Sequence, residues 1–224
     1  MKIVKHLLES NHPDFEVYHQ EYCLGEKAEK GQEVTPISGL LKQAKKGDAT
    51  AQYNLGLKYE QGIDVPRNYQ KAIKWYQRAA DQEFVAAQSR LGVIYQNEPI
   101  VKGLVVKLGS LIVKVDYQDA LKEAFKWNWK AAEQGNVNSQ YNLGWMYGNA
   151  KGVTRNYQEA IKWHQKAADQ GFVGAQYTLG WMYEEGLGVG RNYQEAIKWY
   201  QRAADQGFAD AQAKVDELNK LLGK

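Results

Sequence analysis

The sequence predicts an all-α solenoid built from four helix pairs. The first observation behind this prediction is a Leu-Gly-x-x-Tyr motif that recurs at steps of 36, 52 and 36 residues, beginning at Leu55, Leu91, Leu143 and Leu179. A period of this size is typical of stacked supersecondary units, each of which buries its apolar face only against its neighbours. The second observation is the spacing of apolar residues within a unit, which is that of helices. The middle step carries 16 extra residues, so one unit contains an insertion.

Each unit is expected to contain two helices. In the first unit, helix A runs from residue 49 to about 60 and places Ala51, Leu55 and Tyr59 on one face. Helix B runs from about residue 69 to 82 and has a broader apolar stripe at i, i+3, i+4, i+7 and i+11. A short turn joins the two helices, so we expect them to pack against each other as a pair.

Glycines recur at two places in the unit. One lies in the middle of helix A, where glycine costs roughly 1 kcal/mol relative to alanine, which indicates that helix B crosses closely there. These glycines are Gly56, Gly92, Gly144 and Gly180. The other place follows helix B, where a glycine ends the helix by adopting a positive φ. Gly135, Gly171 and Gly207 are expected to do so.

The repeats are expected to be flanked by other segments. Residues 36–46 should form an N-terminal capping helix, residues 47–209 the four repeats, and residues 210–224 a C-terminal capping helix with a polar outer face. Residues 1–35 are an N-terminal extension that does not follow the repeat and is expected to be helical. Pro13 should open that helix, one face of which contains Phe15, Tyr18 and Tyr22.

The whole unit has the pattern A-x-x-x-L-G-x-x-Y-x-x-G-x-x-V-x-x-N-Y-x-x-A-x-x-W-x-x-x-A-A-x-x-G, which residues 175–207 carry in full. This pattern resembles the Sel-one-like repeat (SLR), a relative of the tetratricopeptide repeat, over about residues 44–215. The tetratricopeptide period is 34, so a period of 36 favours the Sel-one-like family. The resemblance implies a right-handed superhelical solenoid that acts as a protein-binding scaffold, mostly in bacteria.

The insertion covers residues 98–115 and is rich in β-branched residues. Pro99 should end the preceding helix A, and Gly109-Ser110 favours a small β-hairpin or an extended segment. A helix fits as well, because four apolar residues also follow helical spacing. The insertion either folds back on the solenoid or docks a partner or a second copy of the chain. The candidate contact residues are Leu104, Val106, Leu108, Leu111 and Val113.

A second candidate contact surface lies on helix A, since the resemblance implies that helix A lines the concave groove of the solenoid. The positions that vary between units on one face of this helix are Asn54, Leu57, Arg90, Val93, Asn142, Trp145, Thr178 and Trp181. Exposed Trp is typical of binding hot spots. The alternative is that Trp145 and Trp181 pack between units, whereas Met146 and Met182 are expected in the core.

Little in the sequence indicates catalysis. His6, His12, His19 and Cys23 match no zinc spacing, and no nucleophile, base and acid occur in a recognised arrangement, so we expect no catalytic residues, no metal and no cofactor. His164 replaces a helix B tyrosine and is expected in the core. Some cysteine-rich members of the Sel-one-like family are β-lactamase-like, but they carry disulfides and a secretion signal. We disfavour that function here because the chain has one cysteine.

The predicted function is therefore a non-enzymatic scaffold or adaptor that binds a protein or peptide. A cytoplasmic inhibitor or immunity-type protein that blocks an enzyme or toxin is an alternative, and the insertion could pair two copies in a homodimer. The net charge of +3 is slight and spread along the chain, so nucleic acid is not expected as a partner. No apolar run is long enough for a membrane span, and one cysteine with no secretory leader favours the cytoplasm.

Overall fold

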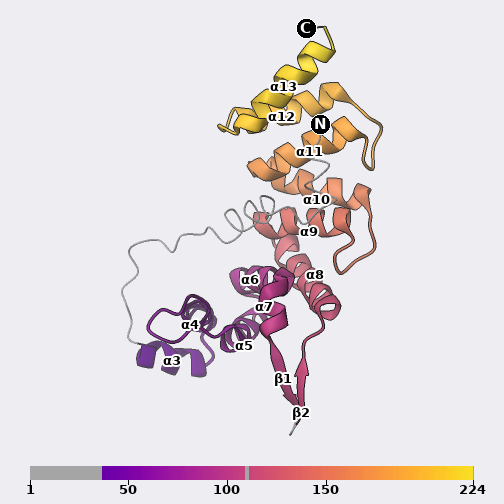
Figure 1. Cartoon of the computed structure of the whole chain (residues 1–224). Coiled ribbons are helices and arrows are strands. Elements are labelled where there is room, and N and C mark those ends of the chain that lie inside the picture. The colour runs from indigo at the N-terminus through magenta and orange to yellow at the C-terminus, as the bar shows by residue number, and fades with distance from the viewer. Residues whose placement is uncertain (1–36, 109–110, 224) are drawn as a thin grey trace.

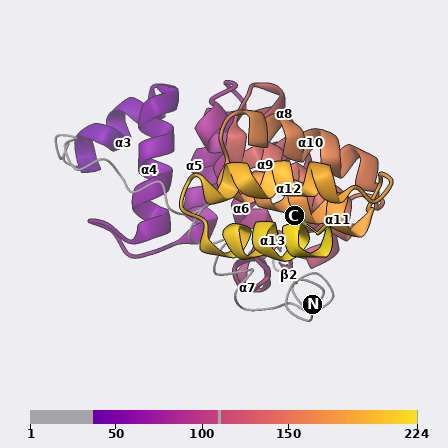
Figure 2. The same cartoon turned by 90° about the horizontal axis from the view of Figure 1, so that it is seen from above.

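The computed structural model of the chain describes residues 37–108 and 111–223. This part forms an all-α solenoid with one small β-hairpin, as predicted, and Figure 1 shows the helices stacked from α3 to α13. The hairpin projects from the stack, and Figure 2 shows the same helices from above. The expected helix in the N-terminal extension and the cluster of His6, His12, His19 and Cys23 lie outside the described residues.

The helices of this region follow the predicted order. They are α3 (Ile37–Lys45), α4 (Ala49–Gln61), α5 (Tyr69–Ala80), α6 (Val85–Gln96), α7 (Glu98–Gly103), α8 (Tyr117–Glu133), α9 (Val137–Asn149), α10 (Tyr157–Asp169), α11 (Val173–Glu185), α12 (Tyr193–Ala204) and α13 (Ala209–Leu221). Apart from α7, each helix packs mainly on the ones before and after it. The A/B pairs are α4/α5, α6/α8, α9/α10 and α11/α12, so the chain has the nearest-neighbour packing of a repeat protein.

A side chain of helix B packs directly on the glycine in the middle of each helix A. A Cβ added at Gly56 or Gly180 would lie 2.5 or 2.6 Å from the ring of Tyr76 or Tyr200. At Gly92 and Gly144 the neighbouring groups are the Asn128 amide and the His164 ring, at 2.5 and 2.6 Å. The predicted close crossing is confirmed in all four pairs.

Glutamine side chains join one pair to the next. The amide of a buried glutamine on each helix A donates to a carbonyl near the end of the preceding helix B, at 3.1–3.3 Å. These donors are Gln52, Gln88, Gln140 and Gln176. Each also accepts from a glutamine that follows its unit's own helix B, at 2.7–2.8 Å. Each of these carbonyls also accepts a backbone N–H from the turn that follows it, so the glutamine amide adds a second hydrogen bond that links neighbouring units.

The turn after helix B requires a left-handed backbone. Gly135, Gly171 and Gly207 have φ values of 88°, 86° and 88°, as predicted. In the first unit the same place is taken by Glu83, whose φ is 62°. A side chain in this conformation is strained, whereas glycine adopts it freely.

The insertion contains a helix that the sequence analysis did not predict. Helix α6 ends at Gln96, but Pro99 lies in the first turn of α7, where its missing N–H costs nothing. The Asn97 side chain caps α7 by accepting from the Ile100 N–H. Strands β1 (Val105–Leu108) and β2 (Leu111–Lys114) then pair antiparallel, with Leu108 opposite Leu111. The predicted hairpin is confirmed for these strands, and the helical alternative, which was based on the spacing of Leu104, Leu108, Leu111 and Val115, is wrong.

His164 lies in the core, as predicted. It is 3% exposed, and its ring packs 5.2 Å from the ring of Tyr141. Burial lowers the pKa of His164 to about 3, so the imidazole is neutral in the folded chain. Met146 and Met182 are also buried, as expected.

Replacing Gly180 with alanine should destabilise the fourth unit. The added Cβ would overlap the Tyr200 ring, and overpacking costs about 1–3 kcal/mol, which exceeds or cancels the gain in helix propensity of about 1 kcal/mol. Urea unfolding followed by circular dichroism should show a free energy of unfolding lower by up to about 2 kcal/mol. Gly190→Ala is the matched control, because nothing lies within 4 Å of that position. A Gly180→Ala chain that is as stable as the control would contradict the close-packing account.

Replacing Glu83 with glycine should stabilise the chain by about 0.5–1 kcal/mol, because the positive φ no longer strains a side chain. The reciprocal change, Gly207→Glu, should destabilise it by a similar amount, since the space around Gly207 is open and only the backbone conformation is affected. Thermal unfolding of both variants measures the effect. Shifts of the same sign in the two variants would rule the backbone explanation out.

His164 should make the chain sensitive to mild acid. Its pKa is lowered by folding, so the stability that comes from its neutral burial is present above about pH 6.5 and is lost as the pH falls toward about 3. Urea midpoints should therefore drop more between pH 7.5 and pH 5 in the native chain than in the variant His164→Asn. That variant places in the third unit the neutral asparagine that packs on the glycine in the second. Equal drops in both chains would show that His164 does not control this sensitivity.

Candidate binding surface

Helix A of every unit presents a common face, which we call the helix A row. It consists of three positions with i, i+4 and i+7 spacing on α4, α6, α9 and α11, which therefore lie on one side of each helix. The row contains Thr50, Asn54, Leu57, Ala86, Arg90, Val93, Asn138, Asn142, Trp145, Gly174, Thr178 and Trp181. All eight helix A residues predicted to bind a partner belong to it. Arg90 is its single charged residue.

The row is more open at its ends than in its middle. Asn54, Leu57, Trp145, Thr178 and Trp181 are half-buried. The three predicted residues that lie between are the most buried, with Arg90 8%, Val93 9% and Asn142 0% exposed. One cause is that α6 and α9 contact each other directly. Whether any of these residues touches a partner stays a prediction.

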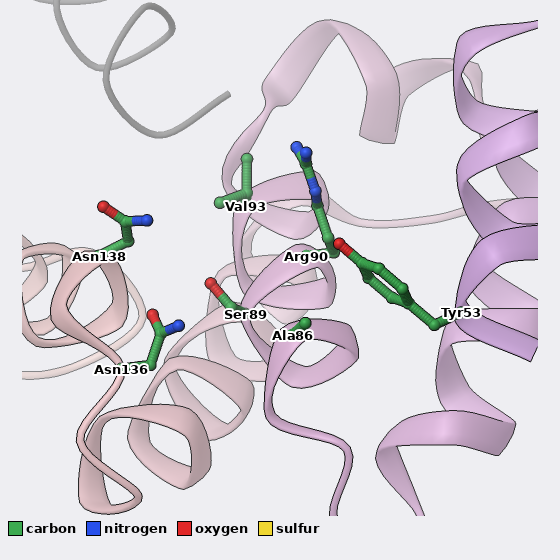
Figure 3. A pocket seen from close by; sticks show the side chains of 7 residues that line it. All are labelled: Tyr53, Ala86, Ser89, Arg90, Val93, Asn136 and Asn138. Carbon is green, nitrogen blue, oxygen red and sulfur yellow. The ribbon is translucent and has the colours of Figure 1, made fainter. Parts of the chain in front are cut away.

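A small hollow lies on the row between α6 and α9. Figure 3 shows α9 side chains facing the α6 side chains, with Tyr53 of α4 beside Arg90. The lining residues are Tyr53, Ala86, Ser89, Arg90, Val93, Asn136 and Asn138. Its volume of about 30 Å³ is room for one or two water molecules. The hollow can therefore take the tip of a side chain but not a drug-sized ligand.

Arg90 belongs to a buried polar network at the first junction, by which we mean the contact between the first and second helix pairs. Its guanidinium lies 3.9 Å from the Glu60 carboxylate, which accepts a 2.5 Å hydrogen bond from the Tyr76 hydroxyl. Burial alone would lower the pKa of Arg90, but Glu60, Tyr53 and Tyr76 together outweigh it and the pKa is raised. Burial, together with Glu60, also raises the pKa of the Tyr76 hydroxyl, which stays protonated. A single cation is thus held in place beside the hollow.

The same network recurs at the last junction and is absent from the two between. Lys214 lies 3.0 Å from Glu184, which accepts a 2.6 Å hydrogen bond from the Tyr200 hydroxyl. The equivalent residues at the two central junctions are neutral. They are Gln96, Asn128 and Asn142 in one, and Gly148, His164 and Thr178 in the other. The Asn142 amide donates to Asn128 at 3.2 Å. Among the described helix pairs, this glutamate–cation pair therefore occurs only at the two ends of the array.

The hairpin offers a second surface. Its register places Val106 opposite Val113 and Leu108 opposite Leu111, so these four residues share one face. Leu104, which precedes β1, is 6% exposed and packs in the core. The insertion residues predicted to contact a partner are thus brought together, with Leu104 joining them to the solenoid.

One exposed aromatic residue was missed by the sequence analysis. Trp129 of α8 is 40% exposed and lies 5.6 Å from the ring of Trp163 and 5.9 Å from that of Phe125. The other three B helices have glutamine at this position, at Gln77, Gln165 and Gln201. A comparison of the B helices position by position would have identified it.

The described ranges offer little for chemistry. Within them, no group of three or more His, Cys, Asp or Glu side chains is placed to hold a metal ion. No helix in the same ranges combines the length and the apolar character needed to cross a membrane.

Comparison with known proteins agrees with this architecture. A solved protective antigen with an SLR fold from uropathogenic Escherichia coli is 35% identical, with a TM-score of 0.68 over 79% of this chain and 34% of its own. A Sel1 repeat protein from Oxalobacter formigenes is 29% identical, with a TM-score of 0.65 over 81% of this chain and 48% of its own. A sel1-like repeat-containing protein of Acanthamoeba polyphaga mimivirus is 32% identical over 137 residues, 54% of this chain. The chain spans a quarter of that relative's length.

The family model described as "Sel1 repeat" matches five segments of the sequence. They are residues 49–84, 85–102, 109–136, 137–172 and 173–208. The second and third segments are the two parts of the unit that contains the insertion. Together the segments cover well over half of the chain, which therefore belongs to the Sel1 repeat family.

Proposed function

We propose that this chain is a non-enzymatic scaffold that binds a protein or peptide along the helix A row. Sel1 repeats generally mediate protein–protein interaction. The observation that carries the proposal is the chemistry of the row, where half-buried tryptophans alternate with amide and hydroxyl side chains and a single cation. Tryptophan and arginine are enriched among residues that dominate binding energy, and amides can pair with the backbone of a bound segment.

The hairpin is the second proposed contact. A two-stranded hairpin is marginally stable on its own in water. Its register groups Val106, Leu108, Leu111 and Val113 on one side, and these apolar residues are the proposed contact. A partner that lies along the row and reaches the hairpin would cover both. The low cysteine content supports a cytoplasmic setting for this scaffold.

Substitution of Trp145 or Trp181 with alanine should reduce partner capture without unfolding the chain. Pull-downs from host lysate, quantified by mass spectrometry, should lose the same specific proteins with both variants. Trp129→Ala is the matched control, because Trp129 is at least as exposed but lies on a helix B. Circular dichroism must show intact helices, since a tryptophan that only packs between units would instead cost about 3–5 kcal/mol of stability. If only Trp129→Ala lost partners, the binding surface would lie on the B helices, and the proposal would be refuted.

A further inference from the structure

We propose that the helix A row is occupied in cis by residues 13–24 of the same chain, and that external partners are segments of the same chemistry. This inference rests on the proposed function, because it takes the row as the binding surface. Residues 13–24 lie outside the described part of the chain. The inference is supported by the chemistry of the row, the sequence of the segment and the length of the linker.

The row defines which chemistry fits it. Its apolar members, Leu57, Val93, Trp145 and Trp181, form a line of one residue per unit, and the remaining members are amide, hydroxyl or small side chains. Arg90 is its only charged member, and its guanidinium is already paired with the Glu60 carboxylate at 3.9 Å. A complementary ligand is therefore an amphipathic segment with an aromatic or aliphatic face.

Residues 13–24 have this composition. Their spacing predicts a helix with Phe15, Tyr18 and Tyr22 on one face. The segment also contains Asp14, Glu16 and Glu21 and has no lysine or arginine. Its aromatic face matches the apolar line of the row, and it adds no second cation beside Arg90.

The linker is long enough to allow the contact within one chain. The described chain begins at Ile37 in α3, which packs on α4, the first helix of the row. The linker of residues 25–36 can span up to about 40 Å, and a twelve-residue helix is about 18 Å long. Packed helices lie about 8–10 Å apart, so the segment can reach α6 and α9, where the hollow is.

Tethering makes even a weak contact effective. A short flexible linker holds its ligand at an effective concentration of the order of millimolar, so a segment with micromolar affinity would fill the row most of the time. An external partner must then displace the segment. The row is consequently selective for partners whose aromatic face binds it more tightly than the chain's own segment does.

The test uses the full chain with the segment altered. The first variant is Phe15→Ala/Tyr18→Ala/Tyr22→Ala, and the matched control is Val17→Ala/Gln20→Ala on the opposite face of the predicted helix. The probe is a fluorescein-labelled synthetic peptide of residues 8–26, with binding followed by fluorescence anisotropy. The triple variant should bind the peptide about ten-fold or more tightly than the native chain, because its row is vacated. The control should bind like the native chain, and Trp145→Ala added to the triple variant should abolish the gain.

Several outcomes would overturn the inference. Equal affinities of the native chain and the triple variant, or no binding to either, would show that the segment is not the occupant. If the triple variant instead abolished a dimer seen by light scattering, the segment would dock on a second copy rather than in cis. Failure of the peptide test while Trp145→Ala and Trp181→Ala still lose partners in the pull-down would refute this inference alone and leave the scaffold function standing.

Discussion

The close crossing of helix B over a glycine of helix A is the contact on which the rest of the solenoid depends. At Gly56 and Gly180 the ring of a buried tyrosine of helix B lies where a Cβ would be, so the ring packs directly on the backbone of helix A. This contact sets the geometry of a pair, and the glutamine links then set the geometry between pairs. Because both geometries are fixed, every helix A presents the same face. The helix A row is therefore a consequence of the packing.

The two central junctions show which substitutions this packing allows. Asn128 and His164 replace the tyrosine that packs on the glycine, and the buried glutamate and cation disappear with it. Breaking one member of a buried charged network leaves the others unpaired, so the members must be lost together. The result is a row with a neutral centre, in which Arg90 contributes the only charge. This neutral surface, rather than a charged cleft, is what the proposed partners would have to match.

Much of the fold was predictable because the same pattern of apolar residues and glycines occurs in four units. The helix pairs, the close crossings and the positive φ of Gly171 follow from residues that recur in register. Helix α7 was not predicted, because Pro99 was taken as the end of a helix when it lies in the first turn of the next one. The burial of Arg90, Val93 and Asn142 depends on how closely α6 approaches α9, which is a tertiary property that no single unit encodes. Trp129 was not predicted because the B helices of the first and fourth units are nearly identical, which indicated packing alone, whereas Trp129 lies in the second unit.

Amide hydrogen exchange, measured on the chain with and without a captured partner, tests the central claim most directly. If partners bind along the helix A row, slower exchange on binding should be concentrated in α6, α9 and α11, with α8, α10 and α12 little changed. Protection confined to the B helices, with none along α6, α9 and α11, would contradict the account.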